Sequence, residues 1–171
     1  MVPADVEPWD RFVRAAPGGT FFHLAGWSRV FSSALGLTPV YLVAERDGQI
    51  AGILPLVHQK SRLFGNALIA APFLVEGGPL AADAAALEAL DRHAAGLLRD
   101  TRAGYLEFRS RKATRPGWQA RTGLYATFRR PIAPTDAGNL QAIPRKQRAV
   151  VRKTLAGGLV STSQEHPPIH S

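Results

Sequence analysis

The chain has 171 residues, of which 46% are hydrophobic and 20% charged, so it is long enough and apolar enough to fold around a core. It contains no cysteine, which excludes a disulfide scaffold, thiol catalysis and a Cys-ligated metal site. The start, MVPADVEPWDRF, lacks the basic and apolar regions of a secretory signal, so we expect a cytoplasmic protein without a transmembrane segment.

The first elements in chain order are expected to be helices. Residues 9–15 favour a short helix, which the Pro-Gly-Gly stretch at 17–19 ends. Apolar residues then recur at helical spacing over 24–35. His23 and Trp27 are four residues apart and would share one helix face, where they can line the mouth of a cleft. Trp27 also belongs to the apolar stripe, which favours a place in the core for it.

The middle of the chain is expected to form a sheet. Two apolar runs, 40–45 and 49–59, flank Asp47-Gly48, which is a strong hairpin signal. A further apolar run at 67–75 contains Pro72, which indicates an edge strand or a bulge.

The second half is expected to add helices and two more strands. Residues 83–102 carry one apolar stripe behind a capping Asp83 and predict a helix. Strands are expected at 105–110 and 124–130, and a last helix at 144–156. The final residues, 161–171, show no periodicity and predict a flexible tail. The pattern indicates a layered α/β fold with a mostly antiparallel sheet and helices packed on it.

Basic residues gather in the C-terminal part of the chain. Residues 1–108 hold 9 Lys and Arg against 11 Asp and Glu, whereas residues 109–171 hold 12 against 2, which together give the net charge of +8. Such an asymmetry suits an acidic partner such as a nucleic acid, a nucleotide, a glycolipid or an anionic membrane, although a solubilising surface explains it equally well.

Four stretches resemble the N-terminal half of FemAB-like proteins, closest to the branch associated with PEP-CTERM/exosortase exopolysaccharide systems. They are GILPLVHQKSRLFGNALIAAPFLVEGGP (52–79), YLEFRS (105–110), LYATFRRPI (124–132) and IPRKQRAVVRKTLAGGL (143–159). The resemblance implies a GNAT-like acyltransferase fold over residues 1–160 and an N-acyltransferase or aminoacyltransferase function in exopolysaccharide or cell-envelope biosynthesis. The family carries two tandem GNAT-like domains, and we expect this chain to hold the first and to be incomplete alone.

The resemblance also implies a donor and an acceptor. Members of the wider family take their acyl group from aminoacyl-tRNA, so tRNA is an expected partner, beside an anionic small molecule or glycolipid precursor. CoA is disfavoured, because no glycine-rich turn with the GNAT pyrophosphate spacing precedes a helix. The residues leave open a non-catalytic module for an anionic glycolipid, nucleotide or RNA, and a CoA-dependent acetyltransferase.

The candidate site residues are a carboxylate and a set of cations. Glu107 alternates with Arg109 on a strand, so it can accept a proton from an attacking amine or simply pair with its neighbour. The candidate ligands for an anionic substrate are Lys60 and Arg62 after a strand, Arg109, and the helix residues Arg145, Arg148 and Arg152. The five histidines do not have metal-ligand spacing, so no metal is expected.

Overall fold

The computed structural model describes residues 6–61, 63, 65–110 and 115–158. The chain divides into two compact units, Met1–Ala120 and Arg121–Ser171, which we call the sheet unit and the helical unit. Arg62 and the expected tail at 161–171 lie outside the described residues. Within the described residues, no helix has both the length and the apolar character needed to cross a bilayer.

The sheet unit is a five-stranded, mostly antiparallel open sheet with helices packed on it. The strands follow the order β1-β2-β3-β5, β4 pairs with β2, and only the β3–β5 pair is parallel. In chain order the elements are α1 (Val6–Ala15), the 3₁₀ turn η1 (Phe21–His23), α2 (Trp27–Arg29), the π-helical turn η2 (Val30–Ala34), β1 (Thr38–Arg46), β2 (Gln49–Ser61), β3 (Gly65–Ala70), β4 (Leu80–Ala81), α3 (Ala84–Asp100) and β5 (Tyr105–Glu107).

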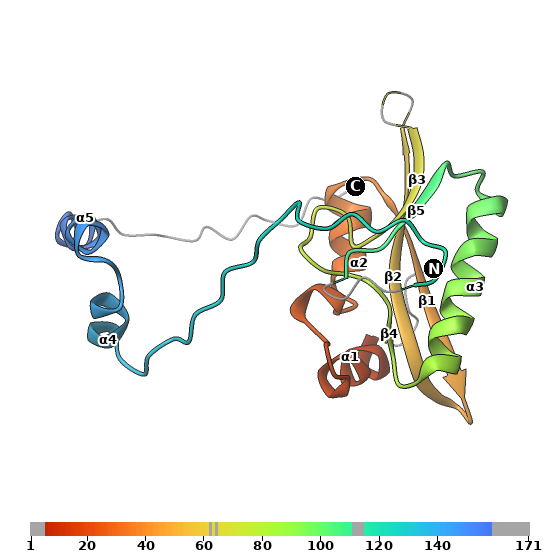
Figure 1. Ribbon diagram of the computed structural model, residues 1–171, viewed down its shortest axis with the longest axis horizontal. Coiled ribbons are helices and arrows are strands. Elements are labelled where there is room, and N and C mark those ends of the chain that lie inside the picture. The colour runs from red at the N-terminus through yellow and green to blue at the C-terminus, as the bar shows by residue number, and fades with distance from the viewer. Residues whose placement is uncertain (1–5, 62, 64, 111–114, 159–171) are drawn as a thin grey trace. The chain divides into compact units, whose positions relative to one another are not determined.

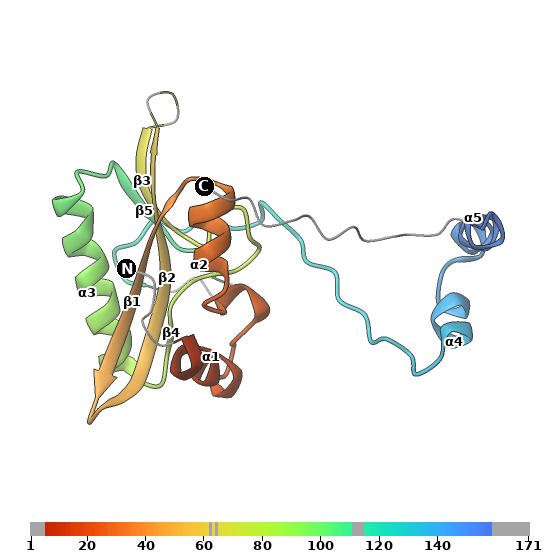
Figure 2. The same ribbon diagram turned by 180° about the vertical axis from the view of Figure 1, so that it is seen from behind.

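The helices cover both faces of the sheet. Figures 1 and 2 show α1 and α2 on one face and α3 on the other. The period-two alternation of β2 explains this arrangement, because successive side chains point to opposite faces. Ile53 packs with Trp9 of α1, Val57 packs with Phe31 of η2, and Leu54 packs with Leu90 of α3. The central strand is therefore buried on both faces.

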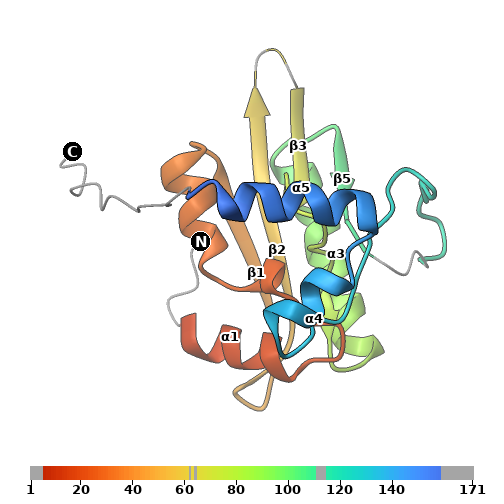
Figure 3. The ribbon, with the colours of Figure 1, turned by 90° about the vertical axis from the view of Figure 1, so that its left-hand side faces the viewer.

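The β1–β2 hairpin was predicted from Asp47-Gly48 and is confirmed. Both residues have positive φ, 51° and 72°, as a two-residue type I′ turn requires, and Arg46 pairs directly with Gln49. Pairing with β1 ends at His58, so the last residues of β2 continue beyond β1 and pair only with β3 (Figure 3).

The predicted helix at 83–102 is confirmed as α3. The side chain of Asp83 caps it by accepting a hydrogen bond from the Ala86 amide at 2.9 Å. The same carboxylate pairs with Arg46 of β1 at 2.6 Å, and this pairing holds the pKa of Asp83 down at about 2. One acidic side chain thus fixes both the start of α3 and its position on the hairpin.

Two sequence expectations differ from the structure. The helix expected at 24–35 begins only after Gly26, as the single turn α2, and continues directly into the π-helical turn η2, which ends at Ala34. No strand forms at 124–130, although Leu124 and Phe128 have the spacing of one strand face. A strand needs a second strand to pair with its backbone groups, and none of the strands in the described residues pairs with this segment.

The helical unit contains α4 (Asp136–Gln141) and α5 (Arg145–Ala156). The last helix was predicted and begins after Pro144, as expected. Helix α4 was not predicted from the sequence. Thr135 caps it by accepting a hydrogen bond from the Gly138 amide at 3.2 Å. In the sequence this cap is a short signal, because no apolar stripe follows it to indicate a helix.

Candidate functional site

A tightly packed loop follows β3 and meets the end of β5. Ala71 and Phe73 have positive φ, which ends β3 before Pro72 and bends the chain away from the sheet. The amides of Gly77 and Gly78 both donate to the carbonyl of Arg109, at 3.0 and 3.1 Å. Glycine is needed at position 77, because a Cβ there would lie only 2.2 Å from the Cβ of Ala71, which cannot rotate away.

A buried histidine holds this loop to the N-terminal helices. The ring of His23 contacts the Gly78 carbonyl through Nε2 at 3.1 Å and the Thr20 hydroxyl through Nδ1 at 2.8 Å. A carbonyl can only accept, so Nε2 carries a proton. His23 lies in η1 and Trp27 in α2, so the two do not share one helix face as predicted. His23 therefore has a positioning role for the loop.

Glu107 and Arg109 form the ion pair that their alternation indicated. Arg109 Nε lies 2.8 Å from Glu107 Oε1, and its Nη1 donates to the Leu74 carbonyl at 3.1 Å. Both side chains are a little over one-third exposed, 36% for Arg109 and 41% for Glu107. The pair thus lies at the surface beside the loop, where a bound substrate can reach the carboxylate and the remaining guanidinium donors.

The structure separates Lys60 from this pair. Lys60 is exposed and pairs with Asn66 in the β2–β3 ladder. Glu107 pairs with Ile69, and Arg109 lies two residues further on, so about 16 Å along the sheet separates Arg109 from Lys60. The two cations therefore cannot hold one small anion together.

Sequence reasoning missed the role of Asn66 in the same stretch. Its Oδ1 lies 2.6 Å from His58 Nε2, and its Nδ2 donates to the carbonyls of Thr101 and Arg102, both at 3.0 Å. These bonds tie the β2–β3 hairpin to the C-terminal end of α3. The sequence signal for this role was an asparagine next to Gly65, but the interpretation of the stretch was based on the charged residues that precede it.

The three arginines predicted as one face of the last helix divide into two roles. Arg148 folds back and donates to the carbonyls of Gln141 and Ile143 at 3.1 to 3.2 Å, so it closes the turn between α4 and α5. Arg145 and Arg152 are exposed and have no partner among the described residues. Only these two offer whole guanidinium groups to an anion.

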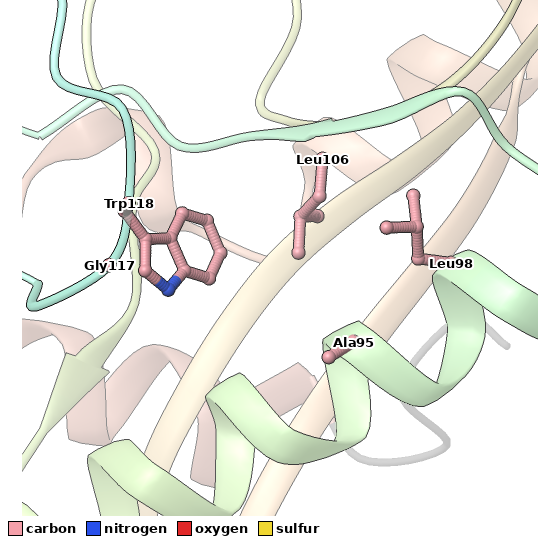
Figure 4. A pocket seen from close by; sticks show the side chains of 5 residues that line it. All are labelled: Ala95, Leu98, Leu106, Gly117 and Trp118. Carbon is pink, nitrogen blue, oxygen red and sulfur yellow. The ribbon is translucent and has the colours of Figure 1, made fainter.

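An apolar hollow of about 240 Å³ lies between α3, β5 and the segment after it (Figure 4). Its lining residues are Ala95, Leu98, Leu106, Gly117 and Trp118. Beside it, Arg115 lies 5.1 Å above the ring of Phe108 and bonds Asp91 at 2.6 Å. No charged side chain lines the hollow, so it is unsuited to the anionic ligands that the sequence indicated.

The described residues contain no group of three or more His, Asp or Glu that could hold a metal ion. No protein-family model matches the chain, and no curated protein matches it.

Proposed function

We propose that the sheet unit is a GNAT-like domain of the FemAB-like type, an N-acyltransferase or aminoacyltransferase component of exopolysaccharide or cell-envelope biosynthesis in the cytoplasm. The observation that carries the proposal is the element order. Two N-terminal helical segments precede an antiparallel meander, and α3 then returns the chain to β5, parallel to β3. This order supports the resemblance carried by residues 52–79 and 105–110.

The chemistry proposed for this domain centres on the Glu107–Arg109 pair. Transfer of an acyl group to an amine requires removal of a proton from the attacking nitrogen, and a carboxylate at hydrogen-bond distance can accept it. Arg109 would hold an anionic group of either substrate through those guanidinium N–H groups that are not bonded to Glu107 or Leu74. Lys60, further along the sheet, is proposed as a separate contact, together with Arg62.

The proposed donor is an aminoacyl-tRNA. A CoA-dependent site cradles pyrophosphate on backbone amides at a glycine-rich turn before a helix. The turn before α3, residues 81–83, contains no glycine and its first amides are capped by Asp83. The thirteen residues between the end of β3 and the start of α3, 71–83, contain the loop held to Arg109 and the short strand β4.

Donor choice is tested by binding and by turnover. The chain is mixed with charged tRNA, uncharged tRNA and acetyl-CoA, and binding is followed by fluorescence anisotropy. We expect charged tRNA to bind more tightly than uncharged tRNA, acetyl-CoA not to bind, and the chain alone not to transfer an acyl group. Measured turnover with acetyl-CoA would overturn the proposal. Glu107→Gln tests the proton acceptor: it should leave tRNA binding unchanged and abolish transfer in any complex that is active.

A second candidate is a non-catalytic module that binds an anionic ligand. It is favoured by the charge of the helical unit, which carries eight Lys and Arg and one Asp over residues 121–158. Equal binding of charged and uncharged tRNA, without turnover in any combination, would favour this candidate over the acyltransferase.

A further inference from the structure

The helical unit is held together by polar contacts and not by a core. Neither α4 nor α5 contains a buried residue. Arg148 bonds the carbonyls of the turn between the helices, and Arg130 donates to the carbonyl of Ala142. Asn139 bonds both backbone groups of Ala133, at 2.7 and 2.9 Å. Leu140, Ile143 and Val151 are half-buried, and the other large apolar side chains of this unit are not used to stabilise it.

These apolar side chains are large and exposed. Phe128 is 94% exposed and Ile132 87% exposed, and they lie in a segment without regular secondary structure. A folded protein rarely leaves several such side chains in water unless they mark an interaction surface. The exposed large apolar residues of the helical unit are Leu124, Tyr125, Phe128, Ile132, Val150 and Leu155.

The same unit presents cations without partners. Arg145 and Arg152 are seven residues apart on α5, and Lys146 and Lys153 form a second row beside them. All four are exposed and make no hydrogen bond or ion pair with another described residue. Asp136 is the sole acidic residue between 121 and 158, so this part of the unit sets one carboxylate against eight Lys and Arg.

We propose that residues 121–156 bind the surface of an anionic lipid bilayer. Exposed cations together with exposed apolar side chains match a surface that has phosphate groups above hydrocarbon. The cations of α5 would contact the lipid phosphates, and Phe128 and Ile132 would enter the boundary of the acyl chains. This inference goes beyond the acyltransferase proposal and requires no activity of the sheet unit.

An RNA partner fits these observations less well. Single-stranded nucleic acids are bound by cations and by aromatic rings on which the bases stack. Tyr125 and Phe128 are the aromatic members of the exposed apolar set, whereas the other four are aliphatic and helix α5, which carries the cations, contains no aromatic residue. Aliphatic side chains gain from burial in hydrocarbon and cannot stack on bases, so the lipid surface uses more of what the unit exposes.

The test is sedimentation of the full chain with vesicles. Vesicles of phosphatidylcholine alone are compared with vesicles that also contain phosphatidylglycerol, at low and high salt. We expect binding to the anionic vesicles only, and weaker binding as salt screens the charges. Inorganic phosphate at matched phosphorus concentration should not compete; if it does, the site recognises free phosphate and the bilayer proposal fails.

Two variants separate the charge and apolar contributions. Changing Arg145, Lys146, Arg152 and Lys153 together to Gln should weaken binding by roughly a hundredfold or more, since each cation near an anionic surface contributes roughly fivefold. Gln keeps the helix propensity of α5. Changing Phe128 and Ile132 to Ser should weaken binding by about tenfold or more.

A matched control removes the same charge from the sheet unit. It replaces four exposed arginines by Gln: Arg11, Arg29, Arg92 and Arg99. We expect this control to bind anionic vesicles nearly as tightly as the unchanged chain. Equal losses in the control and in the α5 variant would overturn the proposal, because net charge alone would then account for binding. Binding to RNA with none to anionic vesicles would also overturn it.

Insertion is tested with a tryptophan reporter. The three native tryptophans lie in the sheet unit, so Phe128→Trp adds one signal in the helical unit. Anionic vesicles should shift the added emission to shorter wavelength, and lipids brominated on the acyl chains should quench it. A shift that is present without vesicles would show that the chain itself covers this side chain, and would refute insertion.

Discussion

Replacing Tyr41 with Phe should stabilise the sheet unit. The ring of Tyr41 stacks on Trp9 with centroids 4.9 Å apart and is 7% exposed, yet its hydroxyl is buried without a hydrogen-bond partner among the described residues. Burial, and then the negative charge of Asp10, raise the pKa of this hydroxyl above its ordinary value of 10.0. The buried hydroxyl therefore lowers the free energy of unfolding, and the packing of the ring on Trp9 offsets this loss.

The magnitude follows from two opposing terms. A buried hydroxyl without a partner costs about 1–3 kcal/mol relative to water. Removing its oxygen leaves a small void and forfeits a few dispersion contacts, which costs a fraction of that amount. We therefore expect Tyr41→Phe to raise the free energy of unfolding by about 1 kcal/mol, which corresponds to about 4 °C in Tm for a unit of this size.

Urea unfolding followed by tryptophan fluorescence measures this change, with Tyr105→Phe as the control. Tyr105 is half-exposed, so its hydroxyl is solvated and its loss should change stability by less than about 0.5 kcal/mol. The pKa gives a second readout: because the folded pKa is raised, the unchanged protein loses stability as pH rises above 10, and the variant should not. A loss of about 1 kcal/mol or more in Tyr41→Phe would refute the reasoning and imply a partner for the hydroxyl.

Three further changes test the loop, the helical unit and the α3 cap. Gly77→Ala should cost about 2 kcal/mol in urea unfolding because its Cβ would lie 2.2 Å from the Ala71 Cβ, whereas Gly26→Ala, with no atom within 4 Å of the new Cβ, should cost less than about 0.5 kcal/mol. Equal costs would contradict the packing at the loop. Arg148→Gln should reduce helical circular dichroism and speed amide exchange in α4, and Arg152→Gln should change neither; an unaltered Arg148 variant would exclude its role in the turn. The lowered pKa of Asp83 means that its ion pair stabilises the fold above pH 3.8, and that this stability is lost as pH falls toward 2. Asp83→Asn should remove that pH dependence, and an identical pH profile in the variant would disprove it.

Local signals in the sequence were sufficient for the central elements of the sheet unit. Asp47-Gly48 dictates a two-residue turn, and the continuous apolar run that follows it is the pattern of a strand buried on both faces. Asp83 and the stripe behind it predicted α3, because a cap and a 3.6-residue period act within one segment.

The remaining features depend on contacts between distant segments. The alternation at 124–130 predicted a strand, but an alternating pattern has no structure until another backbone pairs with it. The candidate cations could be identified by type but not by their partners. Arg148 differs from Arg152 only because carbonyls of the α4–α5 turn are within its reach. The separation of Lys60 from Arg109 follows from strand register, which no local pattern contains.

The parallel pairing of β5 with β3 has a consequence for the order of folding. It joins Ala67 to Tyr105, 38 residues apart, whereas the β1–β2 hairpin closes over two residues. Loop closure costs more entropy as separation grows, so the hairpin is expected to form early and β5 to dock last, after α3. The edge that forms last also opens most readily, and its opening releases the amides of Gly77 and Gly78 from Arg109. A ligand held by Arg109 would oppose that opening by mass action, so hydrogen exchange at these two amides would measure occupancy of the candidate site before any reaction is known.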